Sequence, residues 1–384
     1  MADEIYGAGR EPERGALEQD KRAKAREEAY YVASQWQLIW RKFKKHTLAN
    51  VAGPVILLLY LCAIFADFLS PTLPGSRFTN YLAASPQAIR IHDGERFQWP
   101  FIYDIKRSTD PKTFRRTYAL DKTTTYTIHL LTKGEPYKLL GLFPSDVHLF
   151  GTDGGPLFLL GTDELGRDIF TRILYGSRIS LSIGLVGVVL TLTLGLLMGG
   201  LSGYLGGVTD TIIQRIIDTM VSIPTIPLWM GLAAAVPRDW PALRIYLAIV
   251  IITSLIAWAG LARVVRGKIL SVRQEEFVMA ARLAGVSNMS IILRHLLPAM
   301  TSYVIVSVTL SIPGTILGET SLSFLGLGLQ PPVVSWGVLL RDAQKLETVA
   351  YHPWLLWPAV WIAVTVLTFN FLGDGLRDAA DPYR

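Results

Sequence analysis

Three aspartates near the C-terminus are the first side chains whose type and spacing suggest chemistry. Asp374, Asp378 and Asp381 follow one another closely, and clustered carboxylates are the usual ligands of hard divalent cations. No histidine or further ligand lies at metal-binding spacing nearby, and the six histidines of the chain form no close pair. We therefore interpret these aspartates as part of a solvated, capped cytoplasmic tail, and we expect no metal site.

Motifs of nucleotide-dependent and hydrolytic enzymes are absent from the sequence. The phosphate-binding loop G-x-x-x-x-G-K-[ST] does not occur, and the nearest stretch, 260–268, has the wrong spacing. H-E-x-x-H of metalloproteases and G-x-S-x-G of esterases are also missing. We therefore expect that the chain is not an enzyme, has no catalytic residues and binds no cofactor itself.

The composition indicates a membrane protein. Of 384 residues, 51% are hydrophobic and 18% are charged, whereas soluble domains carry roughly 25% charged residues. The net charge of +6 would suit a nucleic-acid partner, but the basic residues lie beside apolar segments and form no face interleaved with aromatics, so we expect none. The single cysteine, Cys62, supports neither a disulfide framework nor a thiolate metal site.

Any site must be positioned by apolar segments long enough to cross a bilayer, which takes about 20 residues each. One of them, the third along the chain, has features that suggest a path or gate. In the third segment, Ser222 and Pro224 belong to a stretch that would kink a helix, which either widens a path or serves packing alone. The predicted spans are 47–69, 179–204, 219–236, 245–262, 303–317 with its approaches, and 353–372.

The basic residues set the expected orientation. A charged tail, 1–46, ends in "RKFKKH" against the first span, which places the N-terminus in the cytoplasm. Six spans then return the C-terminus to the same side. The segment 70–160 is long enough to be translocated whatever its charge, and its alternating run "TTTYTIHLL" predicts a β-hairpin that turns at residues 133–135. We interpret the aromatics of "RFQWPFIYD" as its core rather than as a ligand site.

The loop 264–298 after the fourth span contains the stretch "EEFVMAARLAGVSNMSIILRHLLPA". Its alanines and one aromatic recur at helical spacing, which predicts a helix face of mostly small residues flanked by charged ones. Gly285 is expected to end this helix in the left-handed conformation, and a second helix would run from a cap at Ser287 to Pro298. The face is formed by Phe277, Ala280, Ala281 and Ala284, with Glu275 and Arg282 beside it. Periodicity alone leaves open an ordinary amphipathic helix at the membrane surface.

Two stretches flank the remaining spans. In 161–181, Asp163 is expected to cap a helix in which Asp168 and Arg172 pair four residues apart. In 317–340, glycines and prolines interrupt an apolar run, which predicts a re-entrant or interfacial element near a path. Trp336 also interrupts this run and is a candidate for the path or gate, and Glu319 is either functional there or simply at the interface.

The loop resembles the coupling loop of ABC importer permeases. The matching positions are Met279, Ala280, Ala281, Gly285, Leu297 and Pro298, with Met279 where glutamate is usual and His295 where an apolar residue is usual. The stretches 161–181, 317–340 and 372–382 resemble peptide-class permeases, in particular their C-type subunit. The resemblance covers the first span and nearly everything from Gly161 to the end.

The resemblance implies an all-α membrane protein with six transmembrane helices of type I ABC importer permease architecture. A small mixed or β-rich extracytoplasmic insertion, 70–160, would separate span one from the permease core, 161–384. The implied partners are a homologous second permease, two ATPase subunits that bind ATP and Mg²⁺, an extracytoplasmic binding protein, membrane lipid and a peptide-like solute. The implied location is the bacterial inner membrane.

A secondary transporter or channel without an ATPase is the alternative. Such proteins usually carry ionisable residues inside the membrane and inverted repeats of spans. Here the predicted spans contain few charges. Asp67 lies near the end of the first span, Asp218 lies just before the third, and no repeat of the spans is evident.

Overall fold

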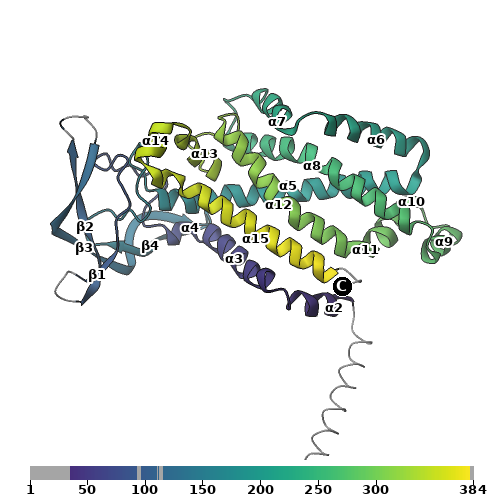
Figure 1. Cartoon of the computed structure of the whole chain (residues 1–384), viewed down its shortest axis with the longest axis horizontal. Coiled ribbons are helices and arrows are strands. Elements are labelled where there is room, and N and C mark those ends of the chain that lie inside the picture. Colours follow the sequence, from purple (N-terminus) through teal and green to yellow (C-terminus); the bar gives the residue numbers. More distant parts are fainter. Residues whose placement is uncertain (1–34, 93–96, 110, 112–115, 381–384) are drawn as a thin grey trace, which may run out of the picture.

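A computed structural model describes residues 35–92, 97–109, 111 and 116–380, so most of the tail 1–46 and Asp381 lie outside the described residues. Long helices form a bundle, and a β-sheet lies at one end of it (Figure 1). The helices are α2 Gln35–Phe43, α3 Thr47–Ile64, α4 Ala66–Leu69, α5 Ile169–Leu205, α6 Gly207–Ser222, α7 Thr225–Ala234, α8 Ala242–Val272, α9 Glu276–Leu283, α10 Asn288–Ile291, α11 Leu297–Ala299, α12 Thr301–Phe324, α13 Trp336–Leu340, α14 Leu346–Tyr351 and α15 Trp357–Ala380.

Within the described residues, five helices are long and apolar enough to cross a membrane. They are α3, α5, α8, α12 and the stretch Pro353–Ala380 that includes α15. A sixth span exists only if α6 and α7, which meet at 90°, count as one. The predicted third span, 219–236, is therefore wrong as a single helix. Pro224 forces Ile223 into an extended conformation (φ −88°, ψ 129°), and the helix ends before it.

Helix α5 begins ten residues earlier than the predicted second span, because the helix expected in 161–181 continues into it. Its cap is Asp168, whose carboxylate accepts a hydrogen bond from the Thr171 amide at 2.8 Å. The prediction that Asp163 caps this helix is wrong, as is the Asp168–Arg172 pair. Arg172 instead forms a buried ion pair with Asp163.

Glycines on α5 bring it close to α8. A Cβ added to Gly199 would lie 2.6 Å from the Ala262 carbonyl oxygen, and one added to Gly203 would lie 2.9 Å from that of Arg266. Small residues let the two backbones approach as in many membrane bundles. The contacts advance in the same direction along both helices, so α5 and α8 run parallel.

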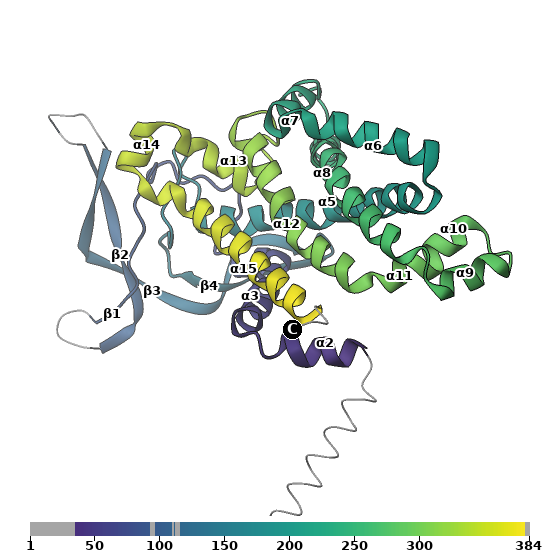
Figure 2. The same cartoon turned by 45° about the vertical axis from the view of Figure 1, so that its right-hand side comes forward.

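Both ends of the described chain lie together. Helix α2 packs beside the C-terminal part of α15 (Figures 1 and 2). A Cβ on Gly375 of α15 would lie 2.3 Å from the Ala49 side chain at the start of α3, which is too close for any larger residue.

The sheet is an antiparallel meander in the order β1-β2-β3-β4. Its strands are β1 Arg90–His92, β2 Phe97–Thr109, β3 Arg116–Leu139 and β4 Phe143–Thr152. The predicted turn at 133–135 is wrong, since β3 continues through it with only a register shift between Lys133 and Tyr137. A side chain on Gly134 would clash with the His148 ring, which packs there. The chain reverses instead at Leu140 and Gly141, both with positive φ.

The aromatic stretch expected to form the core of this region does so only in part. Phe101 and Tyr103 of β2 are buried, whereas Phe97 and Trp99 are exposed. Further along the chain, Phe158 is fully buried. The sheet lies inside the segment 70–160, as the sequence predicted.

Candidate functional site

Helix α9 lies at the end of the bundle opposite the sheet in both views (Figures 1 and 2). It ends as predicted. Gly285 has φ +76°, its amide donates to the Arg282 carbonyl, and the Val286 amide donates to the Ala281 carbonyl, each at 3.1 Å. These two bonds define a Schellman motif. The Ser287 hydroxyl accepts a hydrogen bond from the Ser290 amide and caps α10, as predicted.

The second part of the loop differs from the prediction. A π-helix, Ile292–Leu296, follows α10, and the Leu297 amide donates to the Ile292 carbonyl five residues earlier. Pro298 lies inside the short α11, and the helical path breaks at Met300 instead (φ −111°, ψ 14°). A widened turn directly before Pro298 fits the missing amide hydrogen of proline, which removes one ordinary helical bond.

The residues of the predicted small-residue face of α9 differ in exposure. Phe277, Ala280 and Ala284 are exposed, but Ala281 is only 8% exposed. Ala281 packs inward with Val278 in a cluster that includes Tyr204 of α5. The prediction of one continuous docking face that includes Ala281 is therefore wrong, because contacts with α5 and the following helices cover that side.

The exposed side of α9 includes a residue that sequence reasoning missed. Leu283 is 87% exposed, and Met279 and Arg282 are exposed on the same short helix, while Glu275 precedes its first turn. Leu283 lies six residues after Phe277, so the pair spans nearly two turns. Two large exposed apolar side chains on one short helix would have been a usable signal for a contact surface.

A basic pocket of about 550 Å³ lies between α9 and the end of α5. The Arg282 guanidinium lies over the Tyr204 ring at 5.3 Å and its Nε donates to the Tyr204 hydroxyl at 3.4 Å. Arg273 donates to the Gly203 carbonyl at 3.4 Å. Among the residues that the structure describes, no acidic side chain lines this pocket, and Met279, where the resemblance would place glutamate, is one of the lining residues. The two arginines thus attach the loop to α5 and present positive charge.

Glu319 and Trp336 belong to one buried network that holds the irregular segment 325–335. One oxygen of the fully buried Glu319 carboxylate accepts hydrogen bonds from the hydroxyls of Ser323 and Ser335, each at 2.7 Å. The Ser335 hydroxyl in turn caps α13 by accepting from the Val338 amide at 3.2 Å. Glu319 is therefore not an interfacial side chain.

Trp336 connects this segment to α5. Its amide donates to the Ser180 hydroxyl at 3.1 Å, and its indole donates to the Ile173 carbonyl at 3.2 Å. Ser222 and Pro224 are exposed at the bend between α6 and α7 and take no part in this network. The structure thus brings together two of the four residues predicted for a path or gate.

Replacing Glu319 with alanine is expected to destabilise the protein by roughly 2–4 kcal/mol, since it leaves two buried hydroxyls without their acceptor and opens a cavity. Glu319→Gln keeps an acceptor oxygen at the same length and should cost much less. Thermal unfolding of both variants in detergent measures the difference. Equal unfolding temperatures for the alanine and glutamine variants would show that the network does not hold the segment.

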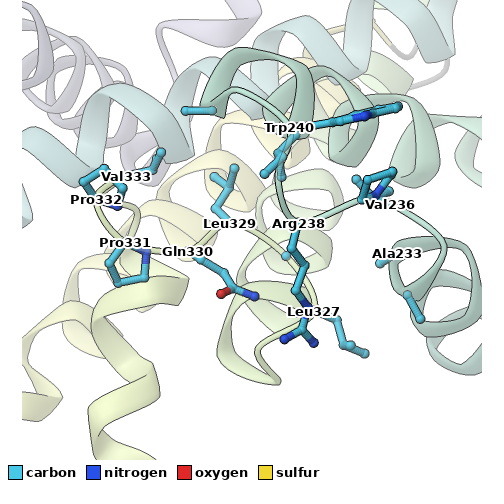
Figure 3. A pocket seen from close by; sticks show the side chains of 15 residues that line it. Ala233, Val236, Arg238, Trp240, Leu327, Leu329, Gln330, Pro331, Pro332 and Val333 are labelled. Carbon is cyan, nitrogen blue, oxygen red and sulfur yellow. The ribbon is translucent and has the colours of Figure 1, made fainter.

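A pocket of about 230 Å³ lies where the segment after α7 meets the segment after α12 (Figure 3). Apolar side chains form most of it, and Arg238, Trp240 and Gln330 add polar groups. Sequence reasoning did not single out these residues, because they come from two loops whose approach depends on the whole bundle.

The described residues contain no group of three or more histidine, cysteine, aspartate or glutamate side chains that could hold a metal ion. Asp374 and Asp378 lie on the last turns of α15, where Asp378 is 3.9 Å from the His46 side chain.

Comparison with known proteins identifies the family. Residues 168–383, more than half of the chain, match the family described as binding-protein-dependent transport system inner membrane component. The chain belongs to this family. Residues 34–86 match the N-terminal transmembrane domain of oligopeptide transport permease C, which agrees with the C-type resemblance.

Individual relatives agree with this assignment. The oligopeptide transport system permease protein OppC of Haemophilus influenzae is 44% identical over 224 residues, which cover 58% of this chain and 69% of the relative. The glutathione transport system permease protein GsiD of Pectobacterium atrosepticum is 33% identical over 91% of this chain and 92% of its own length. An inward-facing structure of the MetNI methionine ABC transporter matches with a TM-score of 0.43 at 18% identity, over 55% of this chain and 97% of the matched chain.

Membership in the family decides between the two hypotheses of the sequence analysis. The protein is a permease subunit of an ABC importer in the bacterial inner membrane, which it crosses several times. Permeases of this kind are not enzymes; they work with a separate ATPase, a second permease and a binding protein. The secondary-transporter hypothesis gains no support from any relative.

Proposed function

We propose that this chain forms half of the translocation path of an importer for peptides or peptide-like solutes. The names of its relatives, which carry oligopeptides or glutathione, support this substrate class. The chain would pair with a homologous permease, accept solute from an extracytoplasmic binding protein and work with two ATPase subunits that bind ATP and Mg²⁺.

We assign the coupling site to the exposed side of α9. This side consists of Phe277, Met279, Ala280, Arg282, Leu283 and Ala284, with Gly285 as the hinge and the loop ending at Pro298. It projects from the end of the bundle away from the sheet (Figure 1). A short helix that exposes a leucine and a phenylalanine beside an arginine matches the usual anatomy of a protein interface. We assign it to an ATPase subunit.

The topology supports six crossings with both termini in the cytoplasm. Since α5 and α8 run parallel, α6 and α7 must carry the chain back from the end of α5 to the start of α8. The bent pair would then be the third crossing. The proximity of α2 to the end of α15 agrees with an even number of crossings. On this basis the divisions are tail 1–46, first span 47–69, insertion 70–160 and core 161–384 with coupling loop 264–298.

In this mechanism, ATP binding would bring the ATPases together and shift the permease from an inward-open to an outward-open state. A ligand can shift such an equilibrium only through contacts that differ between the two states. Here the contact is α9, and the Arg282–Tyr204 interaction links α9 to α5. The Glu319 network would hold the segment 325–335 against α5 during the change.

The proposal is tested by purifying the tagged chain from its native membrane in mild detergent and identifying the co-purified proteins by mass spectrometry. A second permease and ATPase subunits should accompany it. The complex in liposomes, given its binding protein, should then accumulate peptides only with ATP. Recovery of the chain alone, under conditions that preserve other ABC importers, would refute the assembly; ATP-driven uptake of only non-peptide solutes would refute the substrate class.

A further inference from the structure

The turn between β3 and β4 exposes apolar side chains. Leu140, Leu142 and Phe143 are each more than half exposed, and Leu142 reaches 73%. Turns that face water are normally built from glycine, proline and small polar residues. A contiguous exposed apolar patch indicates contact with a partner or with lipid.

The turn is fixed beside the first membrane span. The Leu140 amide donates to the Asp67 carboxylate at 3.3 Å, and Asp67 is itself paired with Arg178 of α5 at 2.7 Å. The Arg178 guanidinium donates to both Asp67 carboxylate oxygens, at 3.0 and 2.7 Å, and so balances the charge of this side chain. Asp67 thus joins the turn to the outer ends of two spans.

A groove of about 570 Å³ separates the turn from α3 and α4, and nearly all of its surface is apolar. Leu139 and Phe143 form one wall. Leu58 and Phe65 belong to the other wall, and they lie seven residues apart, or about 10 Å along a helix. The turn therefore reaches alongside the last two turns of the span.

The turn extends the exposed apolar surface of the first membrane span. Leu58 and Leu61 are exposed on α3, which is apolar and long enough to span the membrane, and Phe65 directly after this helix is exposed as well. The groove is continuous with these side chains because they line it. Lys138, directly before Leu139, is also exposed, and a lysine beside an apolar surface can extend its charged group toward water or lipid phosphates.

Backbone groups usually exclude an irregular turn from the apolar part of a membrane. Here the amides are satisfied within the protein. Gly141 donates to the Lys138 carbonyl at 2.9 Å, Leu142 donates to the Leu139 carbonyl at 3.0 Å, and Leu140 donates to Asp67. The turn can therefore enter lipid with little cost for its amide groups.

We propose that the β3–β4 turn is a membrane anchor. Leu140, Leu142 and Phe143 lie in the outer leaflet, and a phospholipid acyl chain fills the groove between the turn and α3. The anchor fixes the height of the sheet above the membrane. This proposal rests on the membrane location of the chain and does not depend on the peptide substrate.

The test uses a nitroxide spin label at Leu142→Cys in a Cys62→Ser background, within the complete complex in phosphatidylethanolamine and phosphatidylglycerol liposomes. The matched control is Leu120→Cys, which replaces a leucine on the same strand β3 that is 52% exposed and lies in the half paired with β2. Power saturation measures the accessibility of each label to oxygen, which concentrates in lipid, and to a water-soluble nickel chelate.

The proposal predicts a ratio of oxygen to nickel accessibility several-fold higher at position 142 than at position 120. Equal ratios would place the turn in water and overturn the proposal. Protection of position 142 from both reagents would show that a protein partner covers the turn, which would overturn it as well. A label at Phe143→Cys provides a second reading and should give the same high ratio.

Discussion

Replacing Leu283 with glutamate is expected to lower the affinity of the permease for its ATPase by about 30-fold or more. Central apolar residues of interfaces contribute roughly 2 kcal/mol or more each, which corresponds to this factor. Leu283 is 87% exposed, so the substitution removes little contact inside the subunit. The ATPase that co-purifies with the chain, and ATP-dependent uptake in liposomes, measure the effect.

Leu346→Glu is the matched control. Leu346 is 85% exposed, but it lies on α14 at the same end of the bundle as the sheet (Figure 1). The control should leave ATPase binding unchanged. If Leu283→Glu retains the ATPase as well as Leu346→Glu does, α9 is not the coupling site. Ala281→Glu is unsuitable as a test, because a buried charge at that position would disrupt the cluster around Tyr204.

Replacing Arg172 with alanine is expected to destabilise the protein by about 2–3 kcal/mol, because Asp163 loses its more buried arginine partner and keeps only the ion pair with Arg167 at 2.7 Å. The side chains of Arg172 and Asp163 are almost completely buried. Asp163 also accepts hydrogen bonds from the amides of Leu165 and Arg167 at 2.9 Å, so it organises the turn before α5. Membrane abundance and the unfolding temperature in detergent should both fall sharply.

An exposed ion pair elsewhere in the bundle provides a comparison for this prediction. Arg263 pairs with Asp218, but both side chains are about half exposed, and surface pairs contribute roughly 0–1 kcal/mol. Arg263→Ala should therefore have little effect on the unfolding temperature. A similar fall in unfolding temperature in the two variants would mean that burial of the Asp163–Arg172 pair does not determine how much this pair contributes to stability.

Features of the chain that depend on near neighbours were predictable from the sequence. Gly285 and Ser287 act on amides and carbonyls within four residues, so their roles as helix end and helix cap follow from residue type alone. The break near Pro224 was also expected as a kink. Its 90° angle was not, because the angle depends on how α7 packs against α8 and α12.

Features that depend on distant contacts were not predictable in this way. Periodicity placed Ala281 and Ala280 on one face of α9, and only the packing of Ala281 in a cluster that includes the distant Tyr204 and Ile291 separates them. In the same way, Asp168 and Arg172 have the spacing of an ion pair. In the structure, however, Asp168 caps helix α5 and Arg172 pairs with Asp163. The burial of Glu319 required the return of Ser335 to α12.

Helix α5 has 37 residues and no break, which gives it a length of about 55 Å, nearly twice the roughly 30 Å of the hydrocarbon core. Its first turns contact the sheet region through Phe170 and Phe150, and its last turn contacts α9 through Tyr204. A continuous helix of this length behaves as a stiff lever. Tilting it about a point along its length would swing its two ends in opposite directions, so a push on the end beside α9 would reach the end beside the sheet through one continuous helix.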